Sequence, residues 1–149
     1  MKKVANWRVR GQAIIEFTLT LPLIVMILAG LTDLGLVFFF TMSLQNAVRE
    51  GARIAAITPG LGANDSTIAA AVTSRMPPGT MFTLTSVSNT APSGGTTDCG
   101  RTVTVTATGT YDYMFLQIAG FTTVDITRST TMRYEPTTEL CMTLTCSCS

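Results

Sequence analysis

Four cysteines are the residues of this chain best suited to covalent or metal chemistry: Cys99, Cys141, Cys146 and Cys148. Their spacing lacks the two close cysteine pairs of a typical structural zinc site, so it disfavours metal binding. In an oxidising compartment disulfides are the expected state. We expect at least one, with Cys99 bonded to a tail cysteine. The sequence does not choose among the complete pairings, and free thiols in the tail remain the alternative.

The chain contains no histidine, which excludes the kinds of catalysis and of metal site that depend on it. Ser-His-Asp and Cys-His catalysis and His-containing metal sites all require that side chain. The serines and threonines have no partner base, and the Gly-rich segments lack the strand–helix frame of a phosphate loop. A net charge of +1 gives no general basis for binding nucleic acid. We therefore expect no enzyme, no cofactor, no metal, no nucleic acid and no small-molecule substrate.

A basic leader and a long apolar run predict a single membrane-spanning helix. Residues 1–11 carry Lys and Arg but no acid, and residues 14–40 form a long, mainly apolar run whose only charges are two carboxylates. A spanning helix needs about 20 mostly apolar residues, so we expect residues 12–42 to cross the bilayer. The leader cations keep the N-terminus in the cytoplasm and place the rest outside. A cleaved signal peptide is the rival interpretation, but its apolar region has only about 7–15 residues.

The two carboxylates of the run, Glu16 and Asp33, need an explanation. A charge within hydrocarbon costs about 2.5–3.5 kcal/mol or more, whereas one at the headgroup level costs little. Asp33 lies about 20 residues after Gln12, which is close to the outer boundary of a span that begins there. The sequence leaves two placements open for Asp33: a solvated boundary charge, or an intramembrane charge that faces a partner.

The stretch from Gly11 to Phe17, GQAIIEF, follows the basic leader directly. Glycine has no side chain and leaves the backbone open to a peptidase. This stretch resembles the processing site of type IV prepilins, in which a membrane aspartyl peptidase cuts after the glycine. The resemblance implies that Gln12 becomes the first mature residue. It also implies that Glu16 pairs with the freed amine of a neighbouring subunit, with Phe17 beside it in the assembly region.

Further motifs narrow the resemblance. RGQAIIEF at 10–17, LP at 21–22, TDLG at 32–35 and LQNAVREGAR at 44–53 occur in this order. Together they are similar to the TadE-like family, pilin-like proteins of the tight adherence (Tad/Flp) pilus system. The similarity is strong over 10–56 and loose over 103–135, where TTMRYE resembles the family's closing strand. The residues between and the tail at 140–149 match no pattern.

The resemblance implies a role and partners. The chain would be a minor subunit or assembly factor of a Tad pilus, held in a bacterial inner membrane and incorporated in a surface pilus. Its partners would be the prepilin peptidase, other pilin-like subunits, the Tad assembly machinery and membrane lipid. The alternatives are a major filament-forming subunit and an uncleaved, membrane-anchored adhesin or binding domain.

Helical periodicity continues beyond the membrane segment, over residues 43–57. Small and apolar residues fall on one face, and Thr58-Pro59-Gly60 ends the helix. Arg49, Glu50 and Arg53 lie elsewhere on its surface, as a solvated network or as charges that pair with adjacent subunits. The predicted small-residue face consists of Leu44, Ala47, Val48, Gly51, Ala52 and Ala55.

The rest of the chain predicts a short helix and a sheet. Asn64-Asp65-Ser66 offers a cap for a helix over 67–75. Alternation predicts strands over 82–87, 102–110 and 122–134, with 111–120 as a crossing loop and a bulge or exposed end beyond Arg128. The fold class is therefore α+β: a long N-terminal transmembrane helix extends into a small domain with a short helix and a roughly three-stranded antiparallel sheet. The expected divisions are a leader at 1–11, the span at 12–42, its extension at 43–57, the domain at 58–139 and the tail at 140–149.

Overall fold

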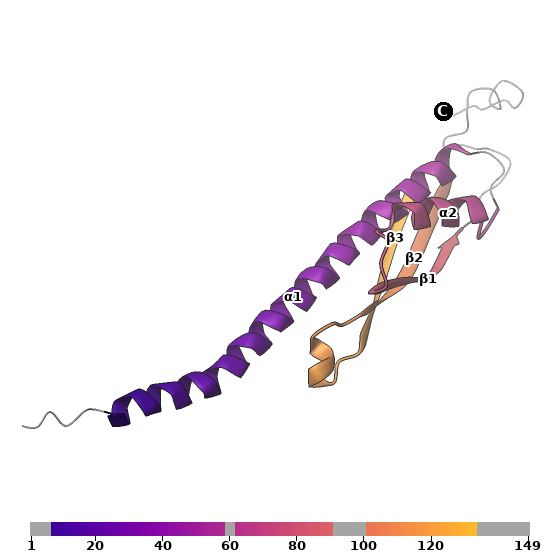
Figure 1. Ribbon diagram of the computed structural model, residues 1–149. Coiled ribbons are helices and arrows are strands. Elements are labelled where there is room, and N and C mark those ends of the chain that lie inside the picture. The colour runs from indigo at the N-terminus through magenta and orange to yellow at the C-terminus, as the bar shows by residue number, and fades with distance from the viewer. Residues whose placement is uncertain (1–6, 59–61, 91–100, 134–149) are drawn as a thin grey trace, which may run out of the picture.

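A long helix runs through the molecule and carries the remaining elements on its C-terminal half (Figure 1). The computed structural model describes residues 7–58, 62–90 and 101–133. Helix α1 spans Trp7–Ile57 and ends just before Pro59, as the sequence predicts. At about 1.5 Å per residue its 51 residues extend roughly 76 Å, more than twice the thickness of a hydrocarbon core. One helix can therefore both cross a membrane and support a domain outside it.

Hydroxyl groups within the apolar half of α1 bond to their own helix. Thr18 Oγ1 donates to the Ile14 carbonyl at 2.8 Å, and Thr32 Oγ1 donates to the Leu28 carbonyl at 2.9 Å. Bonds of this kind remove the need for a partner outside the helix. These threonines are therefore compatible with an apolar surrounding.

The short helix α2, Ser66–Arg75, begins at the cap that the sequence predicts. The Asp65 carboxylate accepts a hydrogen bond from Thr67 N at 2.8 Å, which satisfies one free N–H of the first turn. The buried Asn89 fixes the entry to the helix: its Oδ1 accepts from Asp65 N and its Nδ2 donates to the Gly62 carbonyl, both at 2.8 Å. The start of α2 is thereby tied to the end of the first strand.

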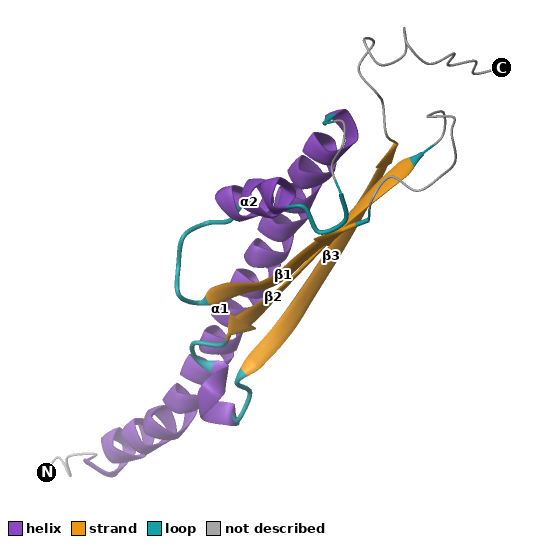
Figure 2. Cartoon of the chain, turned by 90° about the vertical axis from the view of Figure 1, so that its right-hand side faces the viewer, coloured by secondary structure: helices purple, strands orange, loops and turns teal. Residues whose placement is uncertain are grey.

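The sheet is antiparallel, with strand order β1-β2-β3 (Figure 2). The strands are β1 Phe82–Asn89, β2 Thr102–Asp112 and β3 Thr123–Arg133. The predicted crossing loop begins later than expected, because β2 continues through Tyr111 and Asp112. After β2 comes a single 3-10 turn, η1 Leu116–Ala119. The predicted α+β fold is confirmed.

The sequence predicted a bulge or an exposed end beyond Arg128, and the bulge is wrong. The pairing of β3 with β2 continues without a register shift from Thr123 to Arg133, because Arg128 is exposed at the sheet edge and needs no bulge to escape the core. The irregularity lies instead in β1, between Leu84 and Ser86.

One face of the sheet packs on α1, and the other carries paired threonines. On the outer face, Thr104 Oγ1 lies 2.8 Å from Thr131 Oγ1, and Thr108 Oγ1 lies 3.0 Å from Thr127 Oγ1. On the inner face, β2 buries alternate residues against the helix. The predicted small-residue face of α1 is buried throughout. Its inner partners on β2 are Val103, Val105, Ala107 and Tyr111.

At Gly51 the domain lies close against α1. A Cβ atom at this position would lie 2.7 Å from Cγ2 of Val72, on α2, and 3.6 Å from Cγ1 of Val105. Further along α1, the ring of Phe40 stacks on Phe82 with centroids 5.2 Å apart. Small side chains therefore admit α2 at one end of the interface, and aromatic rings fill the other.

Candidate functional site

Asp33 joins the middle of α1 to the far end of the β2–β3 hairpin. Its carboxylate accepts four hydrogen bonds: from Tyr111 Oη at 3.3 Å, Met114 N at 3.1 Å, Phe115 N at 2.9 Å and Leu116 N at 2.7 Å. The side chain is fully buried, although most side chains around it on this part of α1 are exposed and apolar. Of the two placements that the sequence leaves open, the solvated boundary charge does not fit this geometry. The partners of Asp33 lie in its own chain.

The phenol of Tyr111 completes this cluster from the sheet side. Burial, together with the adjacent Asp33 carboxylate, raises the pKa of Tyr111 to about 12. The ring packs against Phe40 at 5.5 Å and against Tyr113 at 5.6 Å between centroids. Tyr111 is therefore a neutral hydrogen-bond donor at any physiological pH.

Residues 113–122 connect β2 to β3, and we call them the tip. Their backbone is internally bonded: Tyr113 N donates to the Thr122 carbonyl at 3.0 Å, and Phe121 N donates to the Leu116 carbonyl at 3.2 Å. Gly120 has φ +92°, a conformation that favours glycine and lets the chain turn back into β3. Together with Asp33, these bonds give most N–H groups of the tip an acceptor. The N–H groups with hydrogen-bond acceptors include those of Tyr113, Met114, Phe115, Leu116, Ile118, Gly120 and Phe121.

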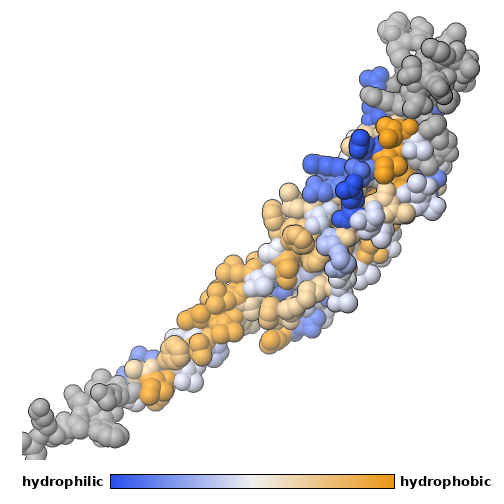
Figure 3. All heavy atoms as spheres, turned by 45° about the horizontal axis from the view of Figure 1, so that its top comes forward, coloured by the Kyte–Doolittle hydropathy of each residue, from blue (hydrophilic) through white to orange (hydrophobic). Residues whose placement is uncertain are grey.

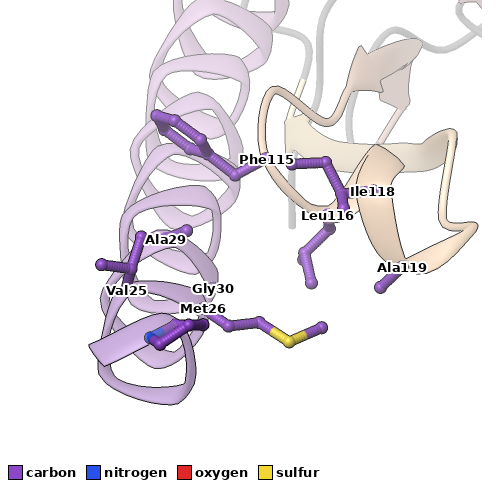
Figure 4. A pocket seen from close by; sticks show the side chains of 9 residues that line it. Val25, Met26, Ala29, Gly30, Phe115, Leu116, Ile118 and Ala119 are labelled. Atoms are coloured by element: carbon purple, nitrogen blue, oxygen red, sulfur yellow. The ribbon is translucent and has the colours of Figure 1, made fainter. Parts of the chain in front are cut away.

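An apolar cavity of about 360 Å³ separates the tip from α1. Figure 4 shows the ring of Phe115 turned toward α1 and the side chain of Met26 reaching from α1 beneath the tip. The helix contributes residues from Pro22 to Gly30, and the tip contributes Leu116, Ile118 and Ala119. The tip therefore lies alongside the apolar half of α1 rather than above it.

The apolar half of α1 is uncovered. Helix α1 is long and apolar enough from Gly11 to Ile57 to cross a membrane by length and composition, and only 11% of its most apolar window is buried. The core helix of a soluble domain would be mostly buried. Figure 3 shows the apolar surface gathered on the middle of the molecule, while hydrophilic residues gather toward the domain end. These properties fit membrane association.

The predicted processing and assembly residues lie at the exposed N-terminal end of α1. Gly11 and Gln12 fall within the helix, and nothing lies within 4 Å of a Cβ placed at Gly11. Glu16 is exposed, and no side chain that the structure describes forms an ion pair with it. Phe17 is 61% exposed. Their predicted roles concern other molecules and stay predictions.

The predicted charge network on α1 includes a partner that the sequence did not indicate. Glu50 Oε1 lies 3.2 Å from Arg75 Nη2, on α2, and 3.9 Å from Arg53 Nη1. Arg49 is exposed on the same helix. Because both arginines of these pairs are largely exposed, the pairs contribute little to stability. The four cysteines lie outside the described residues, so the disulfide stays a prediction.

No group of three metal-ligating side chains occurs within residues 7–58, 62–90 and 101–133. The chemistry of the described site is thus hydrogen bonding and apolar contact. Asp33 fixes the tip beside the apolar half of α1, and Glu16 is presented at its N-terminal end.

Comparison with known proteins identifies one family. The family model described as TadE-like protein matches residues 11–53. The resemblance that the motifs indicate is therefore confirmed over this segment, which includes the predicted processing site, Glu16, Asp33 and most of the small-residue face of α1. Searches of curated proteins and of solved structures found no match.

Proposed function

From the match of residues 11–53 to the TadE-like family, we propose that this protein is a pilin-like component of a Tad pilus, as a minor subunit or assembly factor. The observation that carries the proposal is the exposed apolar half of α1 within the matched segment. A helix of this kind is stable in a bilayer, or packed among similar helices in a filament, and is unfavourable in water. The protein then acts by assembly and is not an enzyme.

Insertion orients the chain with its leader in the cytoplasm of a bacterial cell and its sheet outside the inner membrane. The cations of residues 1–11 favour this orientation. The prepilin peptidase then cuts between Gly11 and Gln12, and Glu16 becomes available to the new amine of a neighbouring pilin-like subunit. The cut site at Gly11 and Gln12 is exposed on α1, which supports access by a peptidase. Glu16 is exposed as well, which supports access by a second helix.

Two other functions remain as alternatives. A major subunit would be the most abundant protein of sheared filaments, whereas a minor subunit would be present in small amounts. An uncleaved adhesin or binding domain would keep its leader. Stoichiometry separates the first alternative from our proposal, and the mature N-terminus separates the second.

Cleavage is tested by mass spectrometry of the N-terminus from cells that carry the Tad system. We expect the wild-type protein to begin at Gln12. Gly11→Leu should leave a full-length precursor in the membrane, because the side chain blocks the open backbone at the cut. Gly30→Ala, a conservative change at an open site in the same helix, serves as the control and should be processed normally. Assembled pili that contain the protein intact from Met1 would refute the proposal.

A further inference from the structure

In the part of the domain that the structure describes, the exposed large apolar side chains lie in the tip. Among the described residues outside α1, the exposed large apolar side chains are Met114, Phe115, Ile118 and Phe121, all within the tip. Ile118 is 89% exposed, which is more than any of the large apolar residues exposed on α1. Nothing in the described domain covers them. A cluster of this kind on a folded domain marks a contact with a membrane or a partner.

The position of the tip along α1 indicates that its contact is with the membrane. The tip faces the helix from Pro22 to Gly30, about 15–27 Å beyond Gln12 at 1.5 Å per residue. A hydrocarbon core of about 30 Å that begins near Gln12 would include this whole interval. The tip therefore lies at the depth of the outer half of the bilayer, beside the helix that crosses it.

The composition of the tip fits that depth. The sequence between Asp112 and Asp125 contains no charged residue, and Gln117 is its most polar side chain. Charged groups return at once on both strands that lead out of it, at Asp112 and Asp125. Uncharged, mainly apolar segments bounded by charged residues are also found where a chain enters a membrane.

The backbone of the tip also fits a position within the bilayer. Non-helical backbone is tolerated in hydrocarbon only where its polar groups are satisfied by protein, since no water is available there. Three consecutive N–H groups of the tip, from Met114 to Leu116, point out of the turn and are all accepted by Asp33. The same contacts satisfy a carboxylate that would otherwise be costly in lipid.

We propose that the tip is a second membrane-inserted element, immersed in lipid acyl chains of the outer leaflet beside α1. Asp33 favours this insertion because its carboxylate, from within the membrane helix, accepts three consecutive N–H groups of the tip. The apolar cavity between Phe115 and Met26 is then occupied by an acyl chain. The inference goes beyond the proposed pilus role and rests only on its membrane-anchored part.

The depth of single tryptophans in vesicles tests the proposal. Trp7 is the only tryptophan of the chain, so Trp7→Phe provides a silent background in the full-length protein. Ile118→Trp then reports on the tip, Leu23→Trp on α1, and Ser129→Trp on the exposed outer face of β3. Ile118 and Leu23 are exposed, so neither replacement disturbs the core. Each variant is reconstituted in phosphatidylcholine vesicles whose acyl chains are brominated, and iodide is the aqueous quencher.

We expect the Ile118→Trp and Leu23→Trp variants to lose most of their emission to brominated chains and to resist iodide, and Ser129→Trp to show the reverse. If Ile118→Trp behaves like Ser129→Trp while Leu23→Trp is quenched by lipid, the tip lies in water and the inference is wrong. If Ile118→Trp resists both quenchers, protein covers the tip, and the inference is again wrong. If Leu23→Trp also escapes the brominated chains, the membrane anchor of the proposed function fails as well.

Discussion

The Oδ2 atom of Asp33 lies 2.7 Å from the backbone nitrogen of Leu116, which is 83 positions further along the chain. This contact holds the end of the hairpin against the middle of α1. The rest of the domain packs on the helix through the core from Phe40 to Ala56, with Leu36 and Val37 alongside. Asp33 therefore extends the attachment of the hairpin to α1 beyond this core, toward the N-terminal half of the helix.

Asp33→Ala should release the tip from α1. It removes the acceptor of three backbone N–H groups, and each unpaired buried donor costs about 1–3 kcal/mol. Hydrogen exchange of residues 113–122, measured by mass spectrometry in detergent micelles, should become much faster. Asp33→Asn is the matched control: its single carbonyl oxygen still accepts, so exchange should increase less. Equal protection in the wild-type protein and Asp33→Ala would show that the contact does not hold the tip.

Gly51→Val should destabilise the domain by about 1–3 kcal/mol, the usual cost of overpacking. Its branched side chain would meet Val72, whose own β-branched side chain cannot easily move away. Chemical denaturation followed by near-ultraviolet circular dichroism measures the change. Gly35→Val is the control in the same helix, since nothing lies within 4 Å of a Cβ there. A loss of stability of equal size at both positions would contradict the tight contact.

Stability should decline at high pH because of Tyr111. Its pKa is raised to about 12 by burial and by Asp33, whereas an unfolded tyrosine titrates near 10. The stabilising contribution of the neutral phenol is therefore complete below about pH 10 and is lost as the pH rises toward 12. Denaturation midpoints measured across this window should fall. In Tyr111→Phe the decline should be smaller, and an identical pH profile in both proteins would contradict the assignment.

Glu16→Ala should separate membrane insertion from assembly. Removal of a charge that is costly in hydrocarbon, by about 2.5–3.5 kcal/mol, makes insertion easier, so we expect normal membrane levels and normal cleavage. The neighbour's new amine at Gln12 would lose its partner, so incorporation into pili should be poor. Immunoblots of membrane and sheared-pilus fractions measure both steps. Glu16→Asp keeps the charge and should assemble better, whereas wild-type assembly by Glu16→Ala would reduce Glu16 to an interfacial charge.

At least one disulfide should form outside the cytoplasm, most simply between Cys99 and a tail cysteine. Closing a loop of some 40 residues would stabilise the domain by about 3–4 kcal/mol in the chain-entropy model. Peptide mapping without reductant, on protein from oxidising cells, identifies the pair. Recovery of all four cysteines as free thiols would disprove the prediction.

The sequence predicted the elements well because their periodicities are strong. The small-residue face of α1 and the alternation of β2 both follow from local spacing, and both are buried as expected. The same face, followed back along the helix in steps of seven from Ala47, passes through Phe40 and reaches Asp33. That extension of the pattern would have placed Asp33 on the buried side.

The partners of Asp33 could not be predicted in the same way. They are mainly backbone N–H groups, which every residue except proline carries, so no side-chain pattern indicates them. The ion pair of Glu50 with Arg75 was missed because it depends on how α2 crosses α1, which spacing along the chain does not specify. Local periodicity was thus enough to predict the helices and strands. How they pack against one another could be learned only from the structure.

The paired threonines on the outer face of the sheet have a consequence for any surface laid against them. Each bond, such as that between Thr108 and Thr127, occupies hydroxyl groups that would otherwise bind water. Removing water from such a face costs less than removing it from free hydroxyls or charges, because part of the hydrogen bonding is already internal. A partner surface can therefore lie against these paired threonines without replacing every hydrogen bond that water would make there.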